Sequence, residues 1–256
     1  MFKNSIAPIG ATFIVALCAT LLTVPSAGAV VLAPGGVINP TGTTFAANPD
    51  LGGLVINDNV LGFRMDPTPA TPLMDVGGNV QNRVVRNGSN NLIFAPRIRD
   101  TFNIDGGIFA VTAFRLEGFG TFSTDVDFRT DGLGDKGFTS VSRSVSGDIM
   151  TFRYDNPLLV DAINPPGRQE ESFFPSILTD AVAFADIGLM TIFGQLVEED
   201  ASGALNPLSD LVSVTIDGIA VPVAPVPLPG AMLLFGPALA GLVLARRQRR
   251  GEPVVS

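Results

Sequence analysis

The sequence has no histidine and only one cysteine, and these absences limit its chemistry strongly. Catalysis by a Ser–His–Asp triad or a Cys–His pair needs an imidazole, and zinc sites are built mainly from histidine and cysteine. These enzymes and metal sites are therefore excluded. A lone cysteine also cannot supply a disulfide framework, so the protein needs a conventional hydrophobic core.

Two aromatic residue types are also scarce, because there is no tryptophan and Tyr154 is the only tyrosine. Sugar rings usually stack on exposed Trp or Tyr, whose faces are apolar and whose edges can donate hydrogen bonds. The phenylalanines fall mostly at positions expected in a core. This composition argues against a lectin-type site, although loops of Asp and Asn leave sugar binding open.

Basic residues are few in the central part of the chain. The segment from Val30 to Pro225 carries 11 basic and 23 acidic side chains, a balance of −12, and Lys136 is its only lysine. Binding to phosphate needs clustered Arg and Lys, so we expect no nucleic-acid partner. The acidic balance suits a surface or matrix protein, or one that meets divalent cations.

Carboxylate chemistry is the remaining catalytic option. A glycosidase would need two carboxyl groups on opposite sides of a cleft, and no spacing in the sequence brings two together. Exposed strand faces and loops explain these side chains, so we expect a protein that is not an enzyme. The glutamates concerned are Glu117, Glu170, Glu171, Glu198 and Glu199.

The densest acidic cluster is a candidate calcium site formed by Asp125, Asp127, Asp131 and Asp135. Calcium takes several oxygen ligands from loops of this kind, so calcium is the one cofactor that the sequence leaves open. The spacing does not match an EF-hand, because Arg129 stands at a ligand position and no Glu closes the loop. Strand alternation already explains Asp125 and Asp127.

The N-terminal residues predict a signal peptide over residues 1–29. Lys3 provides a positive start, and Ile9 to Val24 form an apolar run. Ala27 and Ala29 then supply a small-residue cleavage site, so we expect cleavage after Ala29. The single cysteine would be removed with this segment.

The C-terminal residues predict a membrane anchor. No charged residue occurs from Val226 to Ala245, and about 20 residues in a helix would span roughly 30 Å, close to a bilayer core. Within this run we expect a short transmembrane helix over residues 230–245. Four arginines, Arg246, Arg247, Arg249 and Arg250, follow it. By the positive-inside rule, residues 246–256 would remain cytoplasmic as a basic stop-transfer tail.

This C-terminal segment resembles the PEP-CTERM sorting signal of Gram-negative bacteria, in which a V-P-E-P tetrapeptide precedes a short transmembrane helix and an Arg-rich end. Val226, Pro227 and Pro229 match that motif, whereas Leu228 replaces its Glu, as in the V-P-L-P-A variant. The resemblance implies an exosortase, a membrane-embedded peptidase, as a partner. It is confined to residues 226–256. An ordinary single-pass anchor with a basic flank is the alternative.

The residues between the two ends predict an antiparallel β-sandwich similar to a jelly roll over residues 30–221. Short alternating segments support it, chiefly 83–86, 108–119, 121–129, 141–145, 149–154 and 210–221. We expect turns over residues 30–72, apart from an extended piece at Leu54–Ile56, and a loop over residues 155–171. A strand over residues 183–193 would follow a short helical turn, and residues 195–207 would form a polar connection. Residues 222–229 would form a Pro-rich spacer that ends in the sorting motif.

These features together predict an exported, non-enzymatic protein. It would pass through the inner membrane as a sorting intermediate and end at the cell surface or in the extracellular matrix. The alternative is a surface-anchored module that binds extracellular polysaccharide, with calcium as its candidate cofactor. A carboxylate glycosidase is the third hypothesis, and it predicts hydrolysis that is lost on changing one Glu to Gln.

Overall fold

The protein consists of β-strands and one short 3-10 helix in the parts that the structure describes, a computed structural model of residues 30–66, 74–104, 106–162 and 167–225. No helix in these ranges is long and apolar enough to span a membrane. The elements are β1 (Val30–Val31), β2 (Val37–Ile38), η1 (Pro49–Leu51), β3 (Leu54–Met65), β4 (Val76–Arg86), β5 (Leu92–Asn103), β6 (Ile108–Glu117), β7 (Thr124–Arg129), β8 (Ser140–Arg143), β9 (Ile149–Val160), β10 (Phe174–Thr179), β11 (Ala183–Glu199), β12 (Leu205–Pro207) and β13 (Val212–Val223).

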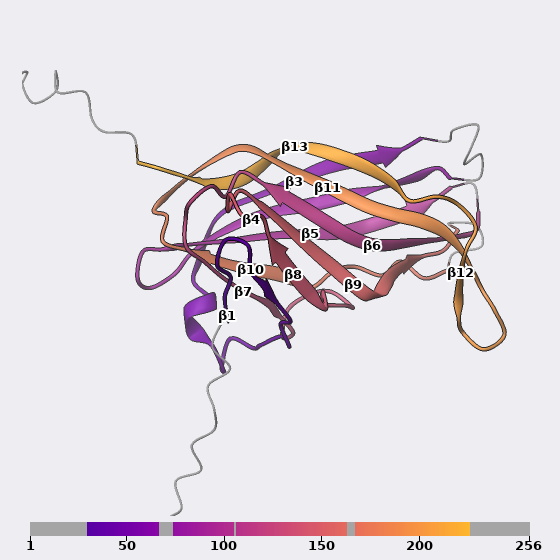
Figure 1. The fold of residues 1–256 in the computed structure, drawn as a ribbon, viewed down its shortest axis with the longest axis horizontal. Coiled ribbons are helices and arrows are strands. Elements are labelled where there is room, and N and C mark those ends of the chain that lie inside the picture. Colours follow the sequence, from indigo (N-terminus) through magenta and orange to yellow (C-terminus); the bar gives the residue numbers. More distant parts are fainter. Residues whose placement is uncertain (1–29, 67–73, 105, 163–166, 226–256) are drawn as a thin grey trace, which may run out of the picture.

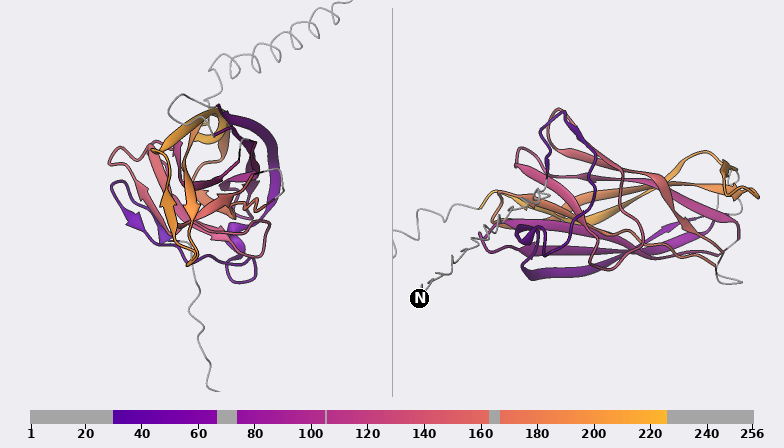
Figure 2. Two further views of the ribbon diagram at one scale, coloured as in Figure 1. Left: turned by 90° about the vertical axis from the view of Figure 1, so that its right-hand side faces the viewer. Right: turned by 90° about the horizontal axis from the view of Figure 1, so that it is seen from below.

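The strands form two sheets with antiparallel pairing (Figure 1). Sheet A has the order β1-β7-β10-β5-β4-β3. Sheet B has the order β12-β11-β6-β9-β8-β2, and β13 also pairs with β11. In the end-on view of Figure 2, the sheets curve towards each other. The sequence-based expectation of an all-β, antiparallel fold is therefore confirmed.

One hydrophobic core lies between the two sheets, and both contribute side chains to it. The chain crosses from one sheet to the other after β1, β2, β5, β6, β7, β9 and β10, so strands distant in sequence share this core. Phenylalanine dominates its centre: the rings of Phe114 and Phe152 stack with centroids 4.4 Å apart. The Phe138 ring meets the Phe152 ring edge-on at 4.9 Å. Burial of these rings supplies much of the driving force for folding.

Several sequence-based predictions of single elements are confirmed. The hairpin of β8 and β9 turns at Gly147, whose φ is +79°. In β13, Val214 is half-buried and Ile216 is buried, whereas Thr215 and Asp217 are exposed, as a period of two requires. The strand continues through Val223, two residues into the expected spacer.

Other predictions of single elements are wrong. Residues 54–65 form one long edge strand, not turns with a short extended piece, because β3 pairs with β4 along its whole length. The expected loop over residues 155–171 begins too early, since β9 continues to Val160. The last three residues of β9, Leu158 to Val160, pair with β6 beyond a register shift. The expected polar connection from residue 195 begins inside β11, which continues to Glu199.

The short helical turn expected before residue 183 is also wrong. Ile177 and Leu178 lie in β10, which is hydrogen-bonded to β7 on one side and to β5 on the other. Pairing on both sides satisfies the main chain of β10, so tertiary context overrides the helical spacing of its apolar residues. Only a bend over residues 180–182 separates β10 from β11.

Candidate functional site

The outer face of sheet A, turned away from the core, carries a row of side chains that the strand registers bring together. Val55 on β3 pairs with Val85 on β4, and Val85 pairs with Ile93 on β5. Phe174 on β10 pairs with Arg129 on β7. Side chains two residues apart project from the same face, so five strands contribute to one surface.

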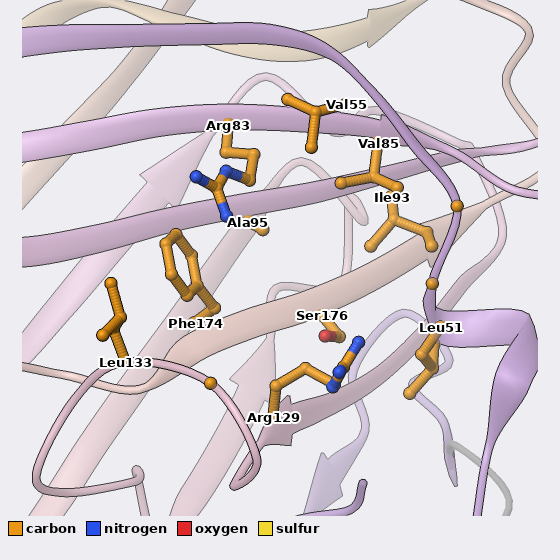
Figure 3. A pocket seen from close by; sticks show the side chains of 13 residues that line it. Leu51, Val55, Arg83, Val85, Ile93, Ala95, Arg129, Leu133, Phe174 and Ser176 are labelled. Carbon is orange, nitrogen blue, oxygen red and sulfur yellow. The ribbon is translucent and has the colours of Figure 1, made fainter. Parts of the chain in front are cut away.

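Two loops rise above this face and enclose a hollow of about 270 Å³ (Figure 3). Leu51 at the end of η1 forms one wall, and Leu133 in the loop after β7 forms the other. The floor is apolar and comes from β3, β4 and β5. Its residues are Val55, Val85, Ile93 and Ala95.

Two arginines, Arg83 and Arg129, also line the hollow, and Figure 3 shows them on opposite sides of it. The guanidinium of Arg83 donates two hydrogen bonds to Asp58, from Nε at 3.1 Å and from Nη2 at 2.8 Å. Its Cζ lies 4.5 Å from the centroid of the Phe174 ring. A cation over an aromatic face is favourable, and the contact fixes the guanidinium beside the hollow.

Arg129 is held in a similar way. Its Nε donates to Asp131 at 2.6 Å, and its Cζ lies 5.5 Å from the centroid of the Phe45 ring. The hydrogen bond from Arg129 holds the pKa of Asp131 below its usual value, against a smaller opposing effect of burial. Both arginines are therefore fixed by partners outside the hollow.

The hollow also contains polar groups without partners. In the described part of the chain, neither Nη1 of Arg83 nor either Nη atom of Arg129 makes a hydrogen bond. The hydroxyl of Ser176, a residue only 2 % exposed, lines the same hollow. These groups can accordingly receive a ligand.

A third arginine, Arg97, lies on the same face beside Phe174, with its Cζ 5.2 Å from the ring centroid. It is buried, forms an ion pair with Glu171 and donates from Nε to the Ser172 carbonyl oxygen at 3.2 Å. Burial, followed by repulsion from Arg99, lowers the pKa of its guanidinium. Guanidinium groups thus cluster on one face of an acidic protein, and no carboxylate lines the hollow itself.

The structure does not gather the four candidate calcium ligands into one site. Asp127 is buried and accepts hydrogen bonds from the main-chain N–H of Gly42 at 3.0 Å and of Phe128 at 2.8 Å. Burial raises the pKa of Asp127, and these two bonds oppose that shift. Asp125, two residues earlier on β7, is half-buried, and burial raises its pKa as well.

The other two aspartates lie in the loop after β7 and have separate partners. Besides its bond from Arg129, Asp131 accepts from the N–H of Phe45 at 2.8 Å. Asp135 accepts from the N–H of Glu171 at 2.8 Å. Over the described ranges, no three His, Cys, Asp or Glu side chains are grouped closely enough to hold a metal ion.

The five glutamates considered for catalysis are placed apart from the hollow. Four form ion pairs: Glu117 with Arg115, Glu170 with Lys136, Glu171 with Arg97 and Glu199 with Arg168. The fifth, Glu198, is exposed near the end of β11. None of the five lines the hollow. The geometry therefore places no pair of carboxyl groups on opposite sides of this hollow.

Little in the sequence pattern indicated the hollow. Arg129 lies in the predicted strand segment 121–129, but Ser176 precedes the predicted strand over residues 183–193, and only the pairing of β7 with β10 brings the two together. The sorting residues Val226 to Pro229, the cleavage residues Ala27 and Ala29, and the basic tail lie outside the described residues. The chain matches no protein-family model, no curated protein and no solved structure.

Proposed function

We propose that this chain is an exported, non-enzymatic cell-surface or matrix protein, sorted by an exosortase-type system. The observation that carries the proposal is the fixed order of Val226–Pro229, an apolar span and an arginine cluster. The position of the last strand supports it, because β13 ends at Val223, three residues before the motif. A peptidase acting near the motif would then cut beyond the folded strands.

The N-terminal side of the described domain supports a cut after Ala29. Val30 and Val31 form β1 and pair with Val126 and Asp125 of β7. The proposed cleavage would therefore leave both of these paired residues in place. In this proposal the domain is a β-sandwich similar to a jelly roll, and the repeated crossing between sheets A and B supports that description.

The intact masses of the protein from the membrane and extracellular fractions of its native host test the sorting proposal. We expect a species that starts at Val30 and ends between Val226 and Gly230. A membrane-bound species that still carries Arg246 to Ser256 would instead identify the tail as an ordinary anchor. A chain retained intact in the cytoplasm would contradict export altogether.

The second candidate function is a surface-anchored module that binds polysaccharide, and the hollow on sheet A favours it. Calcium was the candidate cofactor, but Asp127, Asp131 and Asp135 each have separate partners. We therefore expect any binding to persist when calcium is removed. A glycan array probed with the full chain, with and without chelator, measures glycan binding and its dependence on calcium. Binding to no glycan would count against the module. Loss of binding in the presence of chelator would show that calcium is required after all.

A further inference from the structure

The hollow on sheet A combines two features that a ligand must match, namely an apolar floor and cationic sides. Val85, Ile93 and Ala95 offer no hydrogen bond from their side chains, so the ligand needs an apolar surface against them. Arg83 and Arg129 keep three Nη groups free of hydrogen bonds within the described ranges. These N–H groups match the geometry of a carboxylate.

Three further observations indicate an anion specifically. The lining contains two arginines and no carboxylate, and the aspartates that pair with these arginines, Asp58 and Asp131, lie outside it. The buried guanidinium of Arg97 lies nearby, beside the same Phe174 ring. Ser176 carries the remaining polar side chain of the lining, and its hydroxyl can donate a hydrogen bond to an anionic oxygen.

The volume limits the size of the ligand. About 270 Å³ is just below the roughly 300–1,000 Å³ that is usual for small-molecule sites. The hollow therefore suits one small ring, and not a long stretch of polymer. Leu51 and Leu133 on the two walls would contact such a ring from its sides.

We infer that this hollow binds a small carboxylate-bearing ring, with the carboxylate on Arg129 and Ser176, which lie side by side, and the ring on the apolar floor towards Arg83 (Figure 3). A uronic-acid unit at the end of an extracellular polysaccharide and a free cyclic organic acid share this chemistry. The inference deepens the binding candidate under Proposed function and rests on it. It is independent of sorting, because binding is measured on the purified full chain.

The test is calorimetric titration of the full chain in mild detergent with trigalacturonate, benzoate and neutral maltotriose. We expect a carboxylate probe to bind, maltotriose not to bind, and affinity to fall as salt rises. Tighter binding of trigalacturonate than of benzoate would identify a sugar acid as the ligand. Tighter binding of benzoate would identify a free organic acid. No binding of either carboxylate at millimolar concentration would overturn the inference, as would equal binding of maltotriose.

Substitutions of residues that line the hollow test whether the ligand binds there. Arg129→Gln removes a charge-assisted hydrogen bond and should weaken the carboxylate roughly tenfold or more, whereas Arg129→Lys should retain part of the affinity. Ser176→Ala alters one hydroxyl and should weaken binding with little effect on folding. The control is Arg153→Gln on the outer face of sheet B, which should bind like the wild type. Unchanged affinity in both Arg129→Gln and Ser176→Ala would overturn the site.

Discussion

The guanidinium of Arg143 donates a hydrogen bond of 2.7 Å to the main-chain carbonyl oxygen of Phe122. This bond belongs to a set in which one buried arginine, 4 % exposed, ties together segments distant in sequence. Its other acceptors are the carbonyl oxygens of Leu32, Gly120 and Gly147 and the hydroxyl of Thr124. Burial lowers the pKa of this guanidinium, and main-chain carbonyl dipoles surround it in place of a carboxylate.

Replacing Arg143 with Met should destabilise the protein by roughly 2–4 kcal/mol, because several buried carbonyl groups would lose their donor. The free energy of unfolding in urea measures the effect. Arg153→Met is the matched control: Arg153 is exposed, so its change should stay within about 0.5 kcal/mol. Equal stability of the two variants would show that the Arg143 contacts contribute little.

Asn82 links the two sheets through its side-chain amide. Nδ2 donates to the Gly218 carbonyl oxygen at 3.1 Å, and Oδ1 accepts from the Ala220 N–H at 3.0 Å. Gly218, with φ of +80°, lies where the register between β11 and β13 shifts, so the pairing there is irregular. The amide of Asn82 thus satisfies main-chain groups beside the irregularity.

Asn82→Ala should therefore cost about 2–4 kcal/mol, since two main-chain groups near the core lose their partner at once. Thermal and urea unfolding of the full chain would measure the loss. Asn59→Ala on the exposed side of β3 serves as the control and should be close to neutral. A stability for Asn82→Ala that matches the control would contradict the role of this amide.

The elements that could be predicted from the sequence are those with an undisturbed local pattern. Residues 149–154 of β9 and residues 212–217 of β13 alternate without interruption, and turn residues mark the β8–β9 hairpin. Where pairing includes a bulge, the alternation fails. The registers shift between Val111 and Ala113 and around Gly188, so the full lengths of β9 and β11 were not apparent.

The hollow could not be predicted because it depends on long-range register. Arg129 and Phe174 are 45 positions apart in sequence but directly opposite in adjacent strands. Arg83 joins them only through two further strands, β5 and β4. Composition indicated an acidic protein, whereas three arginines, Arg83, Arg97 and Arg129, gather on one face of sheet A. No local motif encodes that arrangement.

The pKa of Asp127 gives a prediction about pH. Burial raises this pKa above the ordinary value of 3.8, so the carboxyl takes up protons more readily in the folded protein than in the unfolded chain. Its ionised form therefore lowers stability at neutral pH, and this cost disappears as the pH falls through the folded pKa towards 3.8. Asp127→Asn keeps an oxygen that can accept from Gly42 and Phe128, and removes the charge. We expect it to be more stable than the wild type at pH 7.

The comparison with Asp131 makes the sign testable. The hydrogen bond from Arg129 lowers the pKa of Asp131. The ionised form of Asp131 therefore stabilises the fold when the pH is above the ordinary pKa of 3.8, and this stabilisation is lost as the pH falls through the lower folded pKa. Asp131→Asn should therefore be less stable than the wild type at pH 7, by a small amount because the side chain is partly exposed. Urea unfolding of both variants at pH 7 and at a pH below 3.8 gives the two differences, which should have opposite signs at pH 7 and shrink in acid. An Asp127→Asn variant less stable than the wild type at pH 7 would mean that the bonds from Gly42 and Phe128 require the full charge and outweigh the cost of burying it.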